Sequence, residues 1–351
     1  MATLPALQRR PCLVAFSGGR DSSLVLAAAC SAARRWGLPP PVPVTLCFRS
    51  EASDEEPWQA NVLRHLHIDD WQRLSLTHEL DFLGAIAQGR LSTWGLRYPT
   101  NAHSMVPAMQ EAQGGALLTG LGGDDVLGSW RWAAPSTLLP RRRAGAVSPT
   151  AVRAVRTFPP AVRRALLTER VRRQMSRQKR GYSWLTPKGR DVAVAALVDA
   201  DDQPTAWAAF VAWAARRRHI RVTEQTMIEL AARYDVAMPA PLLDRGFLSA
   251  LAAAGHRRGF ADRTAATGAV AAGHLPPELV SRRDKGLFHE VFWGPNARSY
   301  AQSWQGGGVD PSLVDPEALR SEWSSPCPDF RSTLLLHHCW LATHGVEGPR
   351  S

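Results

Sequence analysis

Apolar runs and amphipathic segments alternate along the first part of the chain. Residues 12–16 form a short apolar run that predicts a buried strand, and residues 24–36 carry Ala and Leu at helical spacing. Further strands are expected at residues 44–48, 70–76 and 116–119. Because strands that alternate with helices favour a parallel sheet with right-handed crossovers, we expect an α/β fold.

The later part of the chain has a mainly helical pattern. We expect its main helices at residues 205–218, 222–234, 247–254, 316–323 and 333–343. Asp315 followed by Pro316 is typical of a helix N-terminus, because Asp caps free amides and Pro suits the first helical position. We therefore predict three parts: a parallel α/β core at residues 1–135, a basic and partly mobile segment at 136–190, and a mainly helical part at 191–351 that packs on the core.

The turn after the first predicted strand has the composition of an anion-binding site. Residues 17–23 read Ser-Gly-Gly-Arg-Asp-Ser-Ser, and a predicted helix follows. Glycines let the backbone approach a ligand, the free N–H groups of the helix N-terminus point outward, and the helix dipole favours negative charge. The hydroxyls of Ser17, Ser22 and Ser23 add donors. Asp21 lies where a phosphate would bind, which suits a carboxylate that holds a divalent cation.

A second combination of strand, glycine loop and acid follows the strand expected at residues 116–119. Residues 119–128 read Thr-Gly-Leu-Gly-Gly-Asp-Asp-Val-Leu-Gly. In open parallel sheets a ligand binds beyond the carboxyl ends of the strands, so both glycine loops can face one site. Asp21 and Asp124 can then share a Mg²⁺ ion, which prefers one or two carboxylates plus substrate phosphates. Asp125 is either a further site residue or a solvated cap.

The positive charge of the protein is concentrated in one segment. The 351 residues carry a net charge of +11, and residues 141–180 hold thirteen Lys and Arg against one acid, Glu169. This segment is either a set of solvated helices beside the site or a binding surface for an acidic partner such as a peptide, a carrier protein or RNA. Few aromatic residues lie between these arginines, so base stacking is not indicated and we expect no nucleic-acid partner.

The remaining composition narrows the class of protein. The five cysteines are scattered and form no C-x-x-C pair, so neither a zinc site nor a disulfide framework is indicated, and a reducing cytoplasm fits best. No apolar run reaches the ~20 residues that span a bilayer. Residues 1–10 lack the apolar core of a signal peptide. We therefore expect a cytoplasmic protein without membrane contact.

The loop at residues 17–23 has no Lys after its glycines and is therefore not a Walker loop. It resembles the Ser-Gly-Gly-x-Asp-Ser loop of the ATP pyrophosphatases. The chain as a whole resembles the synthetase domain of the asparagine synthetase family, whose relatives include β-lactam synthetases and lasso-peptide cyclases. This resemblance also rests on Asp54-Glu55 and on residues 119–124, 233–244, 275–278 and 283–286. It implies an adenine-nucleotide α-hydrolase-like core with a parallel sheet, followed by a largely helical second half.

The resemblance also implies a reaction, which is that of an ATP-dependent carbon–nitrogen ligase. A substrate carboxylate attacks the α-phosphorus of ATP, pyrophosphate leaves, and an amine opens the acyl-adenylate to release AMP. The cofactors implied are ATP and Mg²⁺. The resemblance assigns ATP to Ser17, Gly18, Gly19, Asp21, Ser22, Ser23, Gly120 and Gly122, with the adenine near Val14 and Leu46. It assigns Mg²⁺ to Asp21 and Asp124, and the reacting phosphate to Lys285.

Two features depart from the family pattern. A glutaminase half would begin with Cys after Met1, whereas Ala2 stands there, so we expect the amine to be ammonia, a substrate amine, or ammonia from a partner protein. Leu121 stands where amide-forming relatives have Glu or Tyr, and Leu cannot accept a proton. His103, on a neighbouring predicted loop, is the nearest candidate for the general base.

The leading hypothesis is therefore an amide synthetase that adenylates a carboxylate and passes it to an amine, with a peptide as one candidate substrate. Without a glutaminase, peptide or natural-product biosynthesis such as lasso-peptide macrocyclisation fits better than housekeeping asparagine synthesis. One alternative is an RNA-modifying adenylase that uses the basic segment. Another is a non-catalytic partner subunit, against which the intact glycine loops argue.

Overall fold

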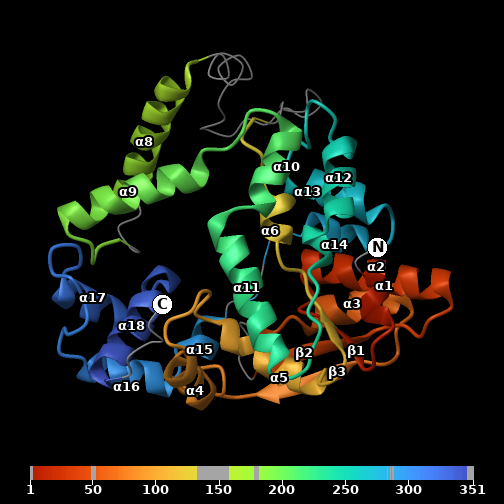
Figure 1. Cartoon of the computed structure of the whole chain (residues 1–351), viewed down its shortest axis with the longest axis horizontal. Coiled ribbons are helices and arrows are strands. Elements are labelled where there is room, and N and C mark those ends of the chain that lie inside the picture. The colour runs from red at the N-terminus through yellow and green to blue at the C-terminus, as the bar shows by residue number, and fades with distance from the viewer. Residues whose placement is uncertain are drawn as a thin grey trace.

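The computed structural model contains a four-stranded parallel sheet, which lies at the lower right in Figure 1. The structure describes residues 3–48, 53–132, 158–177, 182–282, 284, 286 and 288–345. The strands, in the spatial order β3-β2-β1-β4, are β1 (Cys12–Ala15), β2 (Val42–Phe48), β3 (Gln72–Leu76) and β4 (Ala116–Leu118). This arrangement confirms the predicted α/β fold.

Helices connect these strands and make up every later element that the structure describes. Up to β4 and just after it, they are α1 (Thr3–Leu7), α2 (Arg20–Trp36), α3 (Glu56–Leu66), α4 (Ala85–Trp94), the 3-10 helix η2 (Ala102–Met105), α5 (Val106–Glu111) and α6 (Gly123–Val126). The middle of the chain forms α8 (Pro160–Arg177), α9 (Pro187–Asp201), α10 (Trp207–Ala215), α11 (Arg218–Ala232), η3 (Pro241–Leu243), α12 (Arg245–Ala254), α13 (Arg263–Ala271) and α14 (Pro277–Ser281). The last helices are α15 (His289–Phe292), α16 (Pro295–Ser303), α17 (Pro316–Trp323), η4 (Phe330–Ser332) and α18 (Thr333–Thr343).

The strand order creates a topological switch point between β1 and β4. The chain moves outward from β1 to β2 and then to β3, and it later returns to place β4 on the other side of β1. Leu13 of β1 therefore pairs with Val42 of β2 on one side and with Leu117 of β4 on the other. Because connections leave the two strands in opposite directions, a crevice forms at their carboxyl ends, where ligands bind in such sheets.

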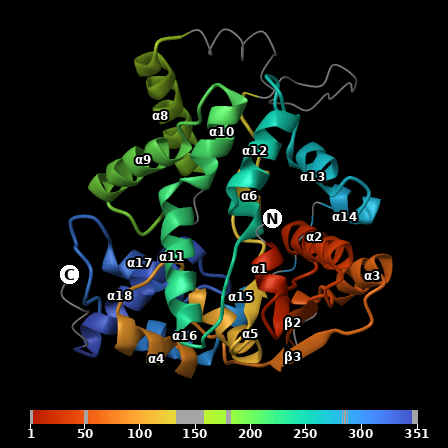
Figure 2. The same cartoon turned by 45° about the vertical axis from the view of Figure 1, so that its right-hand side comes forward.

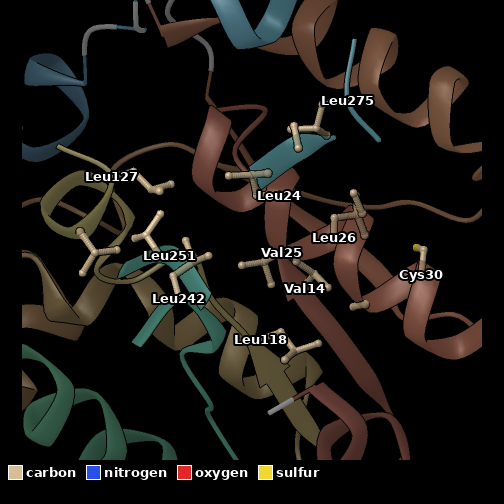
Figure 3. Close-up of a cluster of buried hydrophobic side chains, with 14 of the residues drawn as sticks. Val14, Leu24, Val25, Leu26, Cys30, Leu118, Leu127, Leu242, Leu251 and Leu275 are labelled. Carbon is tan, nitrogen blue, oxygen red and sulfur yellow. The ribbon is translucent and has the colours of Figure 1, made fainter. Parts of the chain in front are cut away.

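The two faces of β1 belong to different hydrophobic clusters, as the alternation of a strand requires. Val14 points toward α2 and packs with Val25 and Leu26, while Leu251 of α12 and Leu275 before α14 extend the same cluster (Figure 3). Leu13 and Ala15 contact the opposite cluster. That cluster is built mainly from η2, α5 and α11. The sheet is therefore covered on both sides, which is typical of a parallel sheet.

The C-terminal helices form a further core beside the sheet. In both views, α16, α17 and α18 lie with α4 on the side away from α2 and α3 (Figures 1 and 2). Their centre contains Trp293, Trp323 and Leu336, which are almost fully buried. The buried carboxylate of Asp81 accepts hydrogen bonds from the amides of Asn296 (2.7 Å) and Ala297 (3.1 Å), so a residue before α4 caps the N-terminus of α16.

Helices α8 and α9 pack on each other at a distance from the sheet (Figures 1 and 2). Leu167, Val171, Val194 and Val198 form a small separate cluster between them. The start of α9 is joined to the C-terminal helices, because Asp315 donates its amide to the carbonyl of Trp184 (2.9 Å). The predicted division into parts at residues 135 and 190 stays a prediction. Within the described ranges, no helix is long and apolar enough to cross a membrane.

Several element boundaries differ from the sequence-based expectation. The structure extends the helix expected at residues 24–36 back to Arg20, because Gly19 is extended and ends the loop. Helix α4 begins only at Ala85, since Asp81 accepts a hydrogen bond from the amide of Leu83 (3.0 Å) and caps α16. The loop expected around His103 contains the 3-10 helix η2. These differences arise from contacts that are distant in the sequence.

Candidate active site

A cavity of about 530 Å³ lies at the carboxyl ends of β1, β2 and β4. It is lined by the loops that follow β1 and β4, by β2, and by residues around η2. The described lining also includes residues from the loop after β2 and α3, from the chain before α4, and from α11. Further lining residues come from the segment before η3, from α13, and from the chain after α14 up to α15. The switch point of the sheet and the cavity thus coincide, and both predicted glycine loops reach it.

The loop after β1 places its hydroxyls in one hydrogen-bonded group. The Oγ atoms of Ser17 and Ser22 lie 3.1 Å apart, and the amide of Ser17 donates to Ser22 Oγ (3.2 Å). No side chain caps the N-terminus of the seventeen-residue helix α2, whose N-cap is Gly19. The first amides of α2 and the two hydroxyls therefore offer the donors that a phosphate group requires.

Glycines bring the second loop into direct contact with the first. A Cβ atom on Gly120 would lie 2.9 Å from the backbone nitrogen of Ser22, and one on Gly123 would clash with the carboxyl group of Asp21. Only glycine allows the backbones to approach this closely. The contact places Asp124, in the first turn of α6, on the same side as Asp21, as the repeated sequence pattern predicts.

Arg263, at the start of α13, bridges the two predicted metal ligands. Its Nη2 donates to both carboxylate oxygens of Asp21 (2.7 and 2.9 Å), and its Nη1 contacts Asp124. Burial alone would lower the pKa of Arg263, but the two carboxylates outweigh this effect and raise that pKa. The Nε atom of Arg263 is buried and has no hydrogen-bond partner. Sequence analysis missed this residue, since no local pattern distinguishes it from other arginines.

The geometry of this cluster fits a Mg²⁺ ion. Both carboxylates lie within contact distance of one guanidinium, so they converge on a single positive centre. Among the described residues, no group of three or more His, Cys, Asp or Glu side chains could hold a metal. A site with two carboxylates therefore needs further oxygen ligands, and ATP phosphates and water provide them in Mg²⁺ sites of this kind.

A buried ion pair fixes the chain on both sides of the predicted catalytic lysine. Arg282 donates from Nη2 to Glu55 Oε1 (2.8 Å), and the amide of Gly286 also bonds to this oxygen. The Arg282 guanidinium stacks 4.5 Å from the ring of Trp58. Lys285 itself lies outside the described residues. Its neighbour Asp284 lines the cavity, as do Glu55 and Arg282. The segment from Arg282 to Gly286, here called the strap, therefore borders the site.

The structure divides the predicted ATP-binding residues into two groups. The first group lines the cavity: Ser17, Gly19, Asp21, Ser22, Leu46 and Gly120. The second group lies behind it and comprises Gly18, Ser23 and Gly122. Gly18 packs against Gln59, Gly122 packs against Leu243, and Ser23 is fully buried. Val14 is also buried, and its neighbour Ala15 reaches the lining instead. The individual roles of these residues stay predictions.

His103 lies behind the cavity wall. Its Nε2 is 2.9 Å from the carbonyl oxygen of Leu80, and its Nδ1 is 3.2 Å from that of Thr100. Burial lowers its pKa, which favours the neutral ring. Both ring nitrogens thus face backbone carbonyls, while the adjacent Ser104 lines the cavity. The role of His103 as general base stays a prediction, and in this arrangement neither nitrogen is directed at the cavity.

Asp125 and Leu121 have different surroundings although both belong to the second glycine loop. Asp125 accepts hydrogen bonds from Arg217 (2.8 Å) and, through its Oδ1, contacts His219 Nε2 (3.0 Å). It therefore ties α6 to the start of α11. Leu121 is partly exposed and lines the cavity. The predicted site consequently has an apolar side chain beside Gly120.

The described part of the basic segment pairs many of its arginines. Arg164 contacts Asp199, Arg172 lies 3.7 Å from Asp191, and Arg173 bonds to Glu169 (2.6 Å). Two of these carboxylates belong to α9, so the packing of α9 on α8 offsets part of the charge of α8. Residues 141–157 and 178–180 of this segment lie outside the described residues.

A parallel sheet with two glycine loops at its switch point, converging carboxylates and an adjoining cavity defines a nucleotide-binding α/β protein. The family model for asparagine synthase matches residues 6–340, and the chain therefore belongs to the asparagine synthase family. A comparison with curated proteins found none that matches. Members of the family are ATP-dependent ligases that form carbon–nitrogen bonds, and the chain is an amide-forming synthetase in that general sense. Carboxylate and amine substrates are thereby implied.

Proposed function

We propose that the protein adenylates a substrate carboxylate, releases diphosphate, and transfers the acyl group to an amine with release of AMP. One observation carries this proposal. Asp21 and Asp124, which follow two adjacent strands, converge on the guanidinium of Arg263 beside the cavity. A site that joins an anion loop, two metal-binding carboxylates and an apolar cavity suits a nucleotide and an organic acid together.

Each group at the site has a part in this reaction. A carboxylate oxygen of the substrate attacks the α-phosphorus, and the bond from that phosphorus to the diphosphate oxygen breaks. Ser17, Ser22 and the first amides of α2 would stabilise the departing diphosphate, and Arg263 adds a cation beside it. Asp21 and Asp124 would hold Mg²⁺, which neutralises phosphate charge when bound. We assign Lys285 to the reacting phosphate, because its neighbour Asp284 in the strap lines the cavity.

We further propose that the reaction belongs to peptide or natural-product biosynthesis, with lasso-peptide macrocyclisation as an example. Leu121 lines the cavity and cannot accept a proton, so in the proposed reaction another group would act as the base or the amine would arrive neutral. The amine would come from the substrate, from free ammonia or from a partner protein. All five cysteines are free, which supports a cytoplasmic location.

ATP–diphosphate exchange tests the proposed function. The protein would be incubated with Mg²⁺, ATP and labelled diphosphate against pools of amino acids, capped peptides and tRNA. Exchange should appear with a carboxylate pool. It should fall by about 100-fold in Asp21→Asn, which removes a proposed Mg²⁺ ligand, and in Lys285→Ala, which removes a positive charge proposed to act on the phosphates. Asp70→Asn, at an exposed position outside the cavity, is the matched control.

The outcomes separate the candidate functions. Exchange that depends on a carboxylate pool and is lost in both site variants supports adenylation. Exchange that requires tRNA would support the RNA-modifying alternative instead. Absence of ATP binding in the intact protein, measured by calorimetry with Mg²⁺, would contradict any enzymatic role and leave the non-catalytic partner.

A further inference from the structure

We infer that the carboxylate substrate carries an apolar side chain next to the carboxyl group that is activated. This side chain would bind against Met105, Met227 and Met238, here called the methionine wall. The inference rests on the proposed adenylation, and it adds the chemical class of the acid. Its basis is the composition of the cavity lining away from the phosphate-binding loops.

Three different elements contribute to the methionine wall. Met105 ends η2, Met227 lies in the middle of α11, and Met238 follows Ala237, whose carbonyl accepts a hydrogen bond from the amide of Leu117 in β4 (2.9 Å). The sequence contains six methionines, so half of them meet at one cavity.

The three side chains form a layer between the hydrophobic core and the cavity. Each is partly buried and packs on the cluster that contains Val106, Leu230 and Val236. Their remaining surface faces the cavity, which they line together. An apolar ligand group that covered this surface would contribute roughly 25 cal/mol for each Å² removed from water. Methionine is flexible and polarisable, so such a wall adapts to aliphatic and aromatic groups alike.

Most charged side chains of the described lining interact with each other, while Arg20 donates to Thr264 and to the carbonyl of Val280 (both 3.4 Å). Asp21 and Asp124 contact Arg263, while Glu55 and Asp284 contact Arg282. The neutral polar side chains of the described lining include Asn101, Ser104 and Thr119; Ser104 precedes Met105, and the amide of Thr119 donates to the carbonyl of Pro239, next to Met238 (3.3 Å). An acid with a second charge, such as aspartate, would bury that charge without an ionic partner here, and such burial is costly.

Leu121 connects this apolar surface with the reacting groups. It lies in the loop that carries Gly120 and Asp124, and it lines the same cavity. Adenine would lie toward Leu46 on β2, on the strand side of the cavity, if the predicted assignment holds. The substrate side chain would then occupy the space between Leu121 and the methionine wall, with its carboxyl group directed at the phosphates.

Matched carboxylate probes test this inference. N-acetyl-leucine and N-acetyl-phenylalanine would be compared with N-acetyl-aspartate and N-acetyl-lysine. Binding would be measured by calorimetry on protein saturated with Mg²⁺ and a non-hydrolysable ATP analogue, and exchange would be measured in parallel. We expect the apolar probes to bind about 10-fold or more tightly than the charged ones, since the charged groups lose water without gaining a partner.

Variants of the wall give a second readout. Met227→Arg should weaken binding of the apolar probes by about 10-fold and improve binding of N-acetyl-aspartate, while the affinity for the ATP analogue stays the same. Met105→Arg repeats the test from another element, in case one variant folds poorly by circular dichroism. Met175→Arg is the matched control, because Met175 lies on α8 outside the cavity lining.

Four results would overturn the inference. The first is equal or tighter binding of the charged probes, and the second is no binding of any probe. The third is a loss of affinity for the ATP analogue in both wall variants, which would place the adenine against the methionines. Exchange with a charged acid that is lost in Asp21→Asn would contradict the apolar substrate class while leaving the adenylation itself supported.

Discussion

Arg263 connects two carboxylates that lie more than a hundred residues apart in the chain. Two carboxylates that face each other without a cation repel, and this repulsion would destabilise the contact between the glycine loops. The guanidinium removes that repulsion in the ligand-free protein. It also leaves a positive charge next to the loop of Ser17 and Ser22, where diphosphate is proposed to bind. A single side chain thus serves both the stability and the charge balance of the site.

His337 makes stability dependent on pH at the residue scale. Burial lowers its pKa from 6.5 to about 3, with a smaller contribution from His103, and its Nε2 donates to the carbonyl of Phe82 (2.9 Å). Between these pKa values the unfolded chain binds a proton that the folded chain does not. The free energy of unfolding should therefore fall as the pH falls below 6.5, with a limiting slope of about 1.4 kcal/mol per pH unit.

Urea unfolding at pH 7 and pH 5 checks this expectation. His337→Gln keeps a donor near Phe82 but cannot titrate, so it should lose less stability than the natural protein over this interval. His338→Gln, at an exposed neighbouring position, is the control and should keep the natural pH dependence. An equal loss of stability in His337→Gln and in the natural protein would contradict the assignment.

At the scale of elements, the strap around Lys285 depends on one buried pair. Glu55 precedes α3 and Arg282 follows α14, and their side chains are 8% and 6% exposed. The same carboxylate bonds to the amide of Gly286. The segment that carries the predicted catalytic lysine is therefore attached to Glu55, in the acidic loop after β2.

Glu55→Gln should lower both stability and activity. It leaves the buried Arg282 with Asp284, which is 71% exposed and 3.3 Å away, in place of its buried partner, and removing one partner of a buried pair typically costs about 3–5 kcal/mol of the free energy of unfolding. Exchange activity should fall further than binding of the ATP analogue, because the strap no longer holds Lys285. Glu56→Gln is the adjacent control, since Glu56 is 49% exposed and pairs with Arg73 at the surface. Comparable losses in the two variants, measured by urea unfolding and exchange, would contradict this role.

At the scale of the whole molecule, the site joins segments from three regions of the sequence. The glycine loops come from the sheet, Arg263 from α13, and the strap from the chain before α15. Helices α8 and α9 have their own small cluster and contribute no residue to the described lining. Ligand binding should therefore order the three regions together and leave α8 unaffected.

Hydrogen exchange followed by mass spectrometry tests this coupling. Addition of Mg²⁺ and an ATP analogue should slow amide exchange at the same time in the two glycine loops (residues 17–23 and 119–126), at the start of α13 and in residues 282–288, because these three regions then contact one ligand. The amides of α8 should exchange at an unchanged rate. Protection limited to residues 17–23, or protection that extends to α8, would contradict a site shared by these regions.

Much of the framework follows from local patterns in the sequence. The four strands lie where apolar runs predict them, and the helices at Pro316–Trp323 and Thr333–Thr343 match their expected bounds. The two glycine loops, and the meeting of Asp21 with Asp124, follow from the strand–loop–acid pattern and the rule for parallel sheets. These features depend on interactions between neighbouring residues or on sheet topology, so a single sequence carries them.

Only the tertiary structure decided which other groups complete the site. Arg263 meets Asp21 across 242 residues, and Arg282 meets Glu55 across 227. Helix packing also decides that three methionines from η2, α11 and the segment beside β4 meet at the cavity. It likewise places His103 behind the cavity wall. Such contacts leave no periodic or local signal in the sequence, because the contacting residues are far apart in the chain and meet only when the helices pack.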